Sequence, residues 1–304
     1  MKRKILHVLA MPLQVVKNML GDIKNAGFTA IQLSPVQPCK KMWKEDTEPM
    51  YTEEWWNINY KEWWTLYQPT DFTIGNRLGN KQDLIELVNT AHEYGIEVYV
   101  DVVLRHLANE TAWNTWYKGN NIELKQFLLP EQFEITDYNN AYQVAYGATC
   151  CLVLDYNSPE LIERFYRPFL TELLDICDGI RLDQAMHYEL HSRFWTSLIA
   201  GLPQSKFKYG ECIHSTEEVC KELSKYMLPL CSIFENWNLT NSVRFGESHD
   251  SYLSFLSSIH WNDETRLNHY ETATKFFTNS IYFMRRQDVT ALCSRMYNIN
   301  HMYN

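Results

Sequence analysis

The sequence predicts an α/β fold of the (β/α)8 TIM-type barrel class, and three observations predict it. The chain has 304 residues, and such a barrel takes about 250 residues plus insertions. Short apolar runs alternate with helical patterns, which is typical of a parallel sheet. Eight such runs can be counted, and eight strand–helix units favour a closed barrel. An open doubly wound sheet is the alternative on the pattern alone.

The first half of the chain predicts three strands and two helices. Strands are expected at 5–10 and 30–33, with a helix over 13–26 between them. A second helix, over 82–94, has apolar residues at i, i+3, i+4 and i+7, which places them on one face. The run 96–104 is almost continuously apolar and rich in β-branched residues, as expected of a parallel strand buried on both faces.

The second half continues the alternation with five more strands. A helix should start where Ser158 precedes Pro159, because serine is a good N-cap and proline suits the first helical position. Pro168 should kink that helix. Ser215 and Glu218 fit a capping box for a later helix. The five strands are expected at 179–183, 207–212, 230–234, 242–245 and 280–284.

The predicted domain organisation is one barrel with one insertion. The barrel covers 1–106 and 154–304, and a small irregular inserted subdomain covers 107–153, after the third strand. Only seven residues, 235–241, separate the sixth strand from the seventh. Helix six is therefore expected to be reduced.

Composition and charge narrow the class of function. The net charge of −9 disfavours a nucleic-acid partner, whose binding domain would usually be basic. No run approaches the 18 or more apolar residues of a membrane span. The 10 Trp, 19 Tyr and 14 Phe suggest a surface that grips a flat, partly apolar ligand.

The eight cysteines form no C-x-x-C pair and indicate reduced thiols rather than disulfides or a zinc site. The sequence has no convincing signal peptide. Together these features favour a cytoplasmic location over secretion.

Polar residues gather where four of the predicted strands end. In a barrel, the reacting groups lie on the loops at this C-terminal face. Three of the four segments carry a carboxylate that could serve the chemistry: Asp183, Glu211 and Asp250. The segments are DVVLRH at 101–106, GIRLDQAMH at 179–187, YGEC at 209–212 and FGESHD at 245–250.

The spacing of these carboxylates points to glycoside chemistry. Neighbouring strands lie about 4.7–4.9 Å apart, so Asp183 and Glu211 could approach the roughly 5–5.5 Å typical of a retaining glycosidase. In such an enzyme one carboxylate attacks the anomeric carbon and the other, protonated, serves the leaving oxygen. Asp250, from across the mouth, could stabilise the positive charge on the sugar. Arg181 shares a face with Asp183 and is expected to keep it ionised.

Taken in order, the four segments resemble the signature regions of the α-amylase family of glycoside hydrolases. The run Trp63 to His106, with WWTLYQPTDF and GNRLGNKQDLIELVNTAHEYGIEVYVDVVLRH, is similar to that family's stretch through the third strand. The resemblance extends over 5–284 and implies an α-glucan partner. It implies that Asp183 is the nucleophile, Glu211 the general acid/base and Asp250 the carboxylate that distorts and stabilises the sugar.

The resemblance also implies substrate-binding residues. Tyr67 would stack on the sugar at the cleavage subsite, and His106 and His249 would hydrogen-bond to it. Arg181 would lie beside the nucleophile, and His187 would line the neighbouring subsite.

Several positions depart from the family pattern. Arg105 stands where an asparagine is usual, Met186 where a lysine is usual, and Val153 where an acidic residue is expected. The sequence also reaches only the end of the barrel, without the usual C-terminal β-sandwich. Many family members hold calcium near the third-strand insertion, but neither Arg105 nor Val153 offers the oxygen ligands that calcium prefers. No metal or other cofactor is therefore expected to be required, and Arg105 should organise the 107–153 insertion instead. The alternative is that Arg105 points to solvent and that other residues, such as Asp137 or Asp155, supply ligands for calcium.

The leading hypothesis is a retaining hydrolase of α-1,4 bonds in starch-like glucans or maltooligosaccharides. One alternative is a non-catalytic or transfer-only glucan-binding relative, such as a glucanotransferase. Another is a metal-dependent barrel hydrolase, with His106, His187, His249 and Asp183 around a divalent ion. The lone His7 on the first strand, without an H-x-H pair, disfavours that last alternative.

Overall fold

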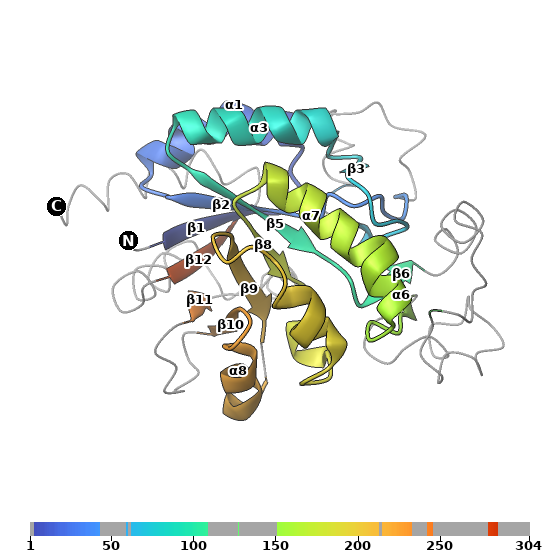
Figure 1. Cartoon of the computed structure of the whole chain (residues 1–304). Helices are drawn as coiled ribbons and strands as arrows, with labels where there is room; N and C mark the ends of the chain where they lie inside the picture. Colours follow the sequence, from blue (N-terminus) through green and yellow to red (C-terminus); the bar gives the residue numbers. More distant parts are fainter. Residues whose placement is uncertain are drawn as a thin grey trace, which may run out of the picture.

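A closed parallel barrel of eight strands forms the centre of the computed structural model (Figure 1). The structure describes residues 3–42, 59, 62–108, 127, 151–212, 215–232, 242–245 and 279–284. Strand β1 pairs in parallel with both β2 and β12, so the sheet closes on itself and the barrel prediction is confirmed. The strands, in their order around the barrel, are β1 (Arg3–Val8), β12 (Asn279–Met284), β11 (Val243–Phe245), β10 (Leu228–Ser232), β9 (Phe207–Glu211), β8 (Gly179–Leu182), β5 (Glu97–Val102) and β2 (Ala30–Leu33).

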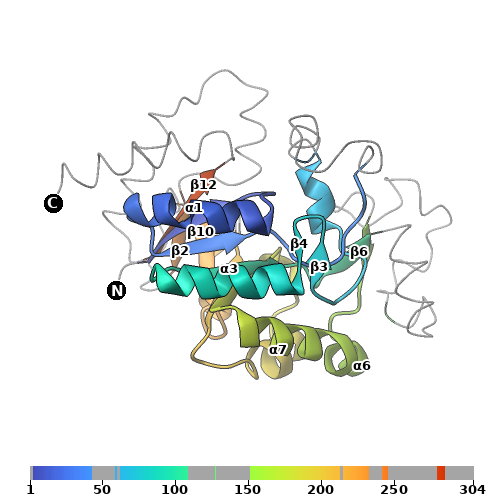
Figure 2. The ribbon, with the colours of Figure 1, turned by 90° about the horizontal axis from the view of Figure 1, so that it is seen from above.

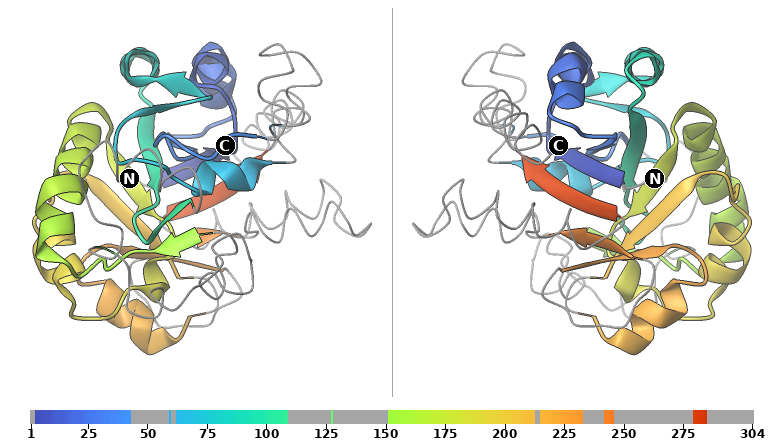
Figure 3. Two further views of the ribbon diagram at one scale, coloured as in Figure 1. Left: turned by 90° about the vertical axis from the view of Figure 1, so that its right-hand side faces the viewer. Right: turned by 90° about the vertical axis from the view of Figure 1, so that its left-hand side faces the viewer.

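Helices cover the outside of the barrel. The helices α1 (Leu13–Asn25) and α3 (Lys81–Glu93) pack side by side, as Figure 2 shows from above. In Figure 3, α7 (Arg167–Ile176) and α8 (Glu217–Leu223) continue this outer layer. The first two helices lie within one residue of their predicted starts and ends.

Two helix starts test the capping predictions. Ser158 accepts a hydrogen bond from Leu161 N at 3.4 Å and starts α6 (Pro159–Leu161), as predicted. A π-helical segment, η5 (Ile162–Tyr166), then leads into α7, so the irregularity expected at Pro168 is taken up just before it. The cap of α8 is Thr216 and not Ser215, because Thr216 Oγ1 accepts from Val219 N at 3.3 Å.

The sequence pattern over 189–200 predicts a further helix, but the structure is helical there over a shorter range. Within 189–200 it has only the π-helical η7 (Phe194–Ile199). The chain before it passes through the short turn η6 (Ala185–His187).

The barrel interior and the layer under the helices are separate apolar clusters. Inside the barrel six buried side chains from different strands meet: Ile5, Ala30, Tyr99, Tyr209, Leu230 and Val243. A larger cluster lies between the strands and the helices. This division is typical of a barrel whose interior is packed rather than open.

The third predicted strand is split in the structure. Strand β5 ends at Val102, and His106–Ala108 form a separate strand, β6, which pairs antiparallel with β7 (Cys151–Val153). This hairpin joins the two ends of the predicted inserted subdomain. Several predictions lie outside the described residues. They concern most of 107–153, the segment 235–241 where helix six is expected to be reduced, and the residues His249 and Asp250.

Three short elements precede α3 in the chain. They are the 3₁₀ turn η1 (Trp63–Tyr67) and the two-residue strands β3 (Gly75–Asn76) and β4 (Gly79–Asn80), which pair antiparallel. Among the described helices, none is both long and apolar enough to cross a membrane.

Candidate active site

The alternation of side chains along the strands brings carboxylates to the mouth of the barrel. Tyr99 and Tyr209 point into the barrel. Asp101 and Glu211 follow them by two residues on the same strands and so share their face, because side chains alternate along a strand. Arg181 is paired in register with Asp101 on one side and Tyr209 on the other. The three polar groups thus form a layer above the apolar interior.

Arg181 joins three carboxylates. Its Nη1 donates to both oxygens of Asp101 at 2.8 Å and to Asp183 Oδ1 at 2.7 Å. Its Nη2 lies 3.0 Å from Glu211 Oε2. All four side chains are buried. The structure therefore brings Asp183 and Glu211, on neighbouring strands, to one guanidinium.

Burial and the Arg181 guanidinium act in opposite directions on the carboxyl groups of this cluster. Burial raises the pKa of Asp183 well above its usual range, Arg181 opposes the rise, and Glu211 and Asp101 add to it. Burial likewise raises the pKa of Asp101 against the effect of Arg181. Arg181 thus lowers the pKa of Asp183, in the direction that the sequence predicts, but burial and the two neighbouring carboxyl groups outweigh this effect, because one cation faces three buried carboxyl groups.

A tight turn after Asp183 fixes Glu211. Gln184 is left-handed, with φ 50° and ψ 36°, and its N–H donates to Glu211 Oε2 at 2.9 Å. A Cβ at Gly210 would lie 2.6 Å from the Cβ of Ala185, so the glycine is what lets η6 lie against β9. The lack of a side chain at Gly210 therefore allows the turn to approach Glu211.

His106 is buried and neutral. Its Nε2 lies 2.8 Å from the Tyr67 carbonyl oxygen, so this nitrogen carries the proton and donates. Burial lowers the pKa of His106 to about 4. Its Nδ1 is then an acceptor, and it has no hydrogen-bond partner within the part of the chain that the structure describes.

The ring of Tyr67 is mostly enclosed. Its hydroxyl donates to Asp101 Oδ2 at 2.9 Å, and its ring meets Trp63 edge-on with centroids 5.3 Å apart. Only 8% of the residue is exposed. Tyr67 thus connects the segment between β2 and α3 to the carboxylate cluster.

We expect the ring and the hydroxyl of Tyr67 to contribute separately. On the expectation from the sequence that this chain hydrolyses a glucan, Tyr67→Ala should lower kcat by about tenfold, since it removes a stacking surface worth about 1 kcal/mol and the contact of the ring with Trp63. Tyr67→Phe keeps the ring and should cost less than about threefold. Steady-state kinetics of both variants checks this. Equal losses in both would assign the effect to the Asp101 contact instead.

His187 and Arg105 lie on the side of the mouth formed by the η6 turn. His187 is half-buried, and burial and Arg105 both lower its pKa. Arg105 donates through Nη1 to Gln184 Oε1 at 3.3 Å. Its predicted bonds to the 107–153 insertion stay a prediction, because most of that segment lies outside the described residues.

Calcium ligands are missing at the two positions that the family resemblance singles out. Arg105 presents a guanidinium, and Val153 is a buried apolar residue paired with His106 in the β6–β7 hairpin. Asp155, a possible substitute ligand, accepts from Asn157 N at 3.2 Å and so caps its own turn. In the described ranges no group of three or more His, Cys, Asp or Glu side chains is arranged to hold a metal ion.

The structure thus unites five of the eight predicted site residues in one connected network and places a sixth, His187, beside it. The five are Asp183, Glu211, Arg181, Tyr67 and His106. His249 and Asp250 lie outside the described residues. Two residues of this network, Gln184 and Asp101, are not among the site residues expected from the sequence. A charged residue two positions after an inward-facing tyrosine is the signal that would have placed Asp101 inside the barrel.

Comparison with known proteins shows that this chain is similar to alpha-amylases. The family model of the alpha-amylase catalytic domain matches residues 12–228. An alpha-amylase from Clostridium acetobutylicum is 26% identical over 291 residues, which cover 82% of this chain and 35% of that protein. An alpha-amylase-related protein from Drosophila elegans is 31% identical over 53% of this chain and 32% of its own length. The chain therefore spans about a third of the length of these relatives.

Solved structures share the fold at low sequence identity. The wild-type alpha-amylase I of Eisenia fetida superposes with a TM-score of 0.65 at 18% identity, covering 92% of this chain and 66% of that one. An alpha-amylase from Lactobacillus plantarum gives 0.66 at 16% identity, covering 98% and 79%. Because the catalytic-domain model matches more than half of the residues of this chain, the chain belongs to the alpha-amylase family.

Proposed function

We propose that this chain is a retaining glycoside hydrolase that cleaves α-1,4 bonds of starch-like glucans or maltooligosaccharides. The observation that carries the proposal is the pair Asp183 and Glu211, held by one guanidinium at the ends of neighbouring strands. Paired carboxyl groups at short separation are what double displacement requires. Family membership supports the same reaction class.

In this proposal the two carboxyl groups divide the work. Asp183 attacks the anomeric carbon while Glu211 gives its proton to the departing glycosidic oxygen, which leaves a covalent glycosyl-enzyme. Glu211, now ionised, takes a proton from water as that water attacks the same carbon and releases Asp183. Two inversions give net retention of the anomeric configuration. Asp250 is proposed to stabilise the positive charge on the sugar.

The substrate side of the proposal rests on the surroundings of the pair. We assign His106 and the ring of Tyr67 to the cleavage subsite, as membership of the family implies. We assign His187 to the neighbouring subsite and His249 to the cleavage subsite. An alpha-amylase I variant from Eisenia fetida has been solved with maltohexaose, which makes a short α-glucan the first substrate to test.

The experiment is product analysis on soluble starch and maltohexaose, with Asp183→Asn as the blank. Proton NMR during the first minutes should show the new reducing end in the α configuration. Products longer than the substrate would indicate a glucanotransferase. An initial β product, or equal turnover by the blank, would overturn double displacement through Asp183.

We also propose that the enzyme works without calcium, and a chelator tests this. Excess EDTA should leave kcat and Tm unchanged, because the residues at 105 and 153 supply no oxygen ligands. Arg105→Ala should lower Tm by several degrees, since it removes the bond to Gln184. A loss of activity in EDTA that added calcium restores would contradict the proposal.

A further inference from the structure

The residue after Asp183 has its backbone N–H, its carbonyl and its side-chain oxygen engaged in hydrogen bonds. The N–H of Gln184 donates to Glu211 Oε2 at 2.9 Å, and its carbonyl accepts from His187 N at 2.9 Å. Its side-chain Oε1 accepts from Arg105 Nη1 at 3.3 Å. One residue therefore connects the end of β8 with Glu211 on β9 and with the segment after β5.

This connection depends on an unfavourable backbone conformation. Gln184 is one of three non-glycine residues with positive φ in the described ranges, together with Ala10 and His191. The left-handed region costs a residue with a Cβ on the order of 1 kcal/mol or more, so it persists only where surrounding contacts hold it. With β8 before it and the η6 turn after it held in place, Gln184 can leave this conformation only if the peptide between Asp183 and Gln184 rotates, which would turn the Gln184 N–H away from Glu211.

Arg105 supplies such a contact from a fixed position. Its carbonyl accepts from Leu154 N at 2.9 Å, so its backbone is tied to the residue after β7. Its guanidinium reaches back over the mouth to Gln184, and its Nε is buried without a hydrogen-bond partner among the described residues. A guanidinium in that setting has few alternative acceptors. The contact is therefore expected to be persistent.

We propose that Arg105 and Gln184 are positioning residues for the general acid/base Glu211. Arg105 holds the side chain of Gln184, and the left-handed turn of Gln184 holds Glu211 Oε2. Neither residue is assigned contact with the reacting atoms. The inference deepens the proposed hydrolase and rests on it only for the role given to Glu211; the bonding chain itself is independent of the reaction.

Amide hydrogen exchange tests the bonding chain without any substrate. In Arg105→Met, the Gln184 amide should exchange about tenfold faster than in the unmodified chain, because its bond to Glu211 is less often formed. The Asp183 amide, which donates to Val102 O at 2.9 Å in the barrel sheet, is the internal control and should not change. An unchanged Gln184 rate, or an equal rise at Asp183, would overturn the proposal.

Three further variants sharpen the assignment. Arg105→Lys keeps a donor at this position and should retain part of the protection of the Gln184 amide. Gln184→Glu keeps the acceptor and should retain most of that protection. His191→Gly relaxes another left-handed residue, whose side chain is 69% exposed, and should leave the Gln184 rate unchanged. A rise in His191→Gly equal to that in Arg105→Met would contradict a specific role for Arg105.

Kinetics then tests the consequence for Glu211. Arg105→Met should lose about tenfold on maltohexaose, since small displacements of a catalytic group are costly. It should lose less than about twofold on an aryl maltotrioside with a good leaving group, which needs little protonation. Equal losses on both substrates would contradict positioning of the acid. If the unmodified chain cleaves neither substrate, the proposed function fails, and the exchange rates still decide the Arg105–Gln184 pair.

Discussion

Asp183→Asn should reduce hydrolysis of maltohexaose by about 10⁴-fold or more, because an amide cannot form the glycosyl-enzyme intermediate. Binding should persist, since the histidines and the Tyr67 ring are untouched. Calorimetry with maltohexaose and single-turnover kinetics measure the two quantities separately. Loss of binding together with turnover would mean that the side chain supports the shape of the site and not the chemistry.

Glu211→Gln should give a different pattern. Hydrolysis of maltohexaose should fall by about 10²- to 10⁴-fold, the range for loss of a general acid. Formation of the glycosyl-enzyme from an activated aryl glycoside should be much less affected. If both variants lose the same factor on both substrates, the assignment of nucleophile and acid is wrong.

A matched control lies at the other end of the same strand. Asp178 directly precedes β8 and accepts a hydrogen bond from Val98 N at 2.8 Å, at the end of the barrel opposite the predicted site. Asp178→Asn removes the same charge from an aspartate near β8 and should leave kcat unchanged. A large loss in this control would show that kcat responds to general destabilisation of the strand.

The main features of the site could be predicted because they depend on short-range rules. Alternation along a strand, combined with parallel pairing of β8 with β9, is enough to place Asp183 beside Glu211. The start of α6 at Ser158 likewise needs only local capping chemistry. Such features follow from residue types and spacing within one or two elements.

The features that were missed depend on contacts between distant segments. The left-handed conformation of Gln184 has no signal in the sequence, because the contacts that hold it come from Arg105 and Glu211. The net shift in the pKa of Asp183 could not be predicted for a similar reason. The sequence placed one arginine beside it, but burial and the approach of Asp101 and Glu211 exist only in the folded barrel.

Arg181 should be the residue of this cluster whose loss destabilises the fold most. Arg181→Met leaves three buried carboxyl groups without their shared cation, and breaking a buried ion pair costs about 3–5 kcal/mol. Urea unfolding at about pH 7.5 should show a loss of that size. The cost arises from charge that remains in the interior, so it should depend on whether the carboxyl groups are ionised.

The sign of that dependence follows from the raised pKa values. Asp101 and Asp183 have a higher pKa in the folded barrel than in the unfolded chain, so they bind protons more tightly when folded. Their protonated forms support the fold fully below the ordinary aspartate range near pH 4, and that support is lost as the pH rises through the folded pKa. Without Arg181 these pKa values rise further. The variant should therefore approach the stability of the unmodified chain near pH 4 and fall increasingly below it toward neutral pH.

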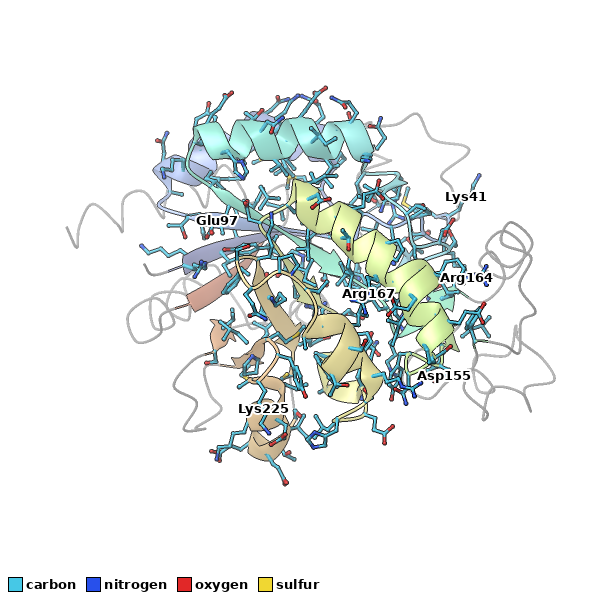
Figure 4. The ribbon with its side chains drawn as sticks, in the orientation of Figure 1. Lys41, Glu97, Asp155, Arg164, Arg167 and Lys225 are labelled. Carbon is cyan, nitrogen blue, oxygen red and sulfur yellow. The ribbon has the colours of Figure 1, made fainter. Side chains whose placement is uncertain are left out.

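Arg167→Met provides the comparison at the surface. Arg167 belongs to the outer helix α7 (Figure 4), where its Nη2 lies 2.8 Å from Glu163 Oε1, four residues earlier and 55% exposed. Solvent screens such a pair, so its loss should change stability little at either pH. If Arg181→Met behaves in this way too, with a loss that does not grow between pH 4 and 7.5, the buried carboxyl groups do not carry the charge that double displacement at this site requires.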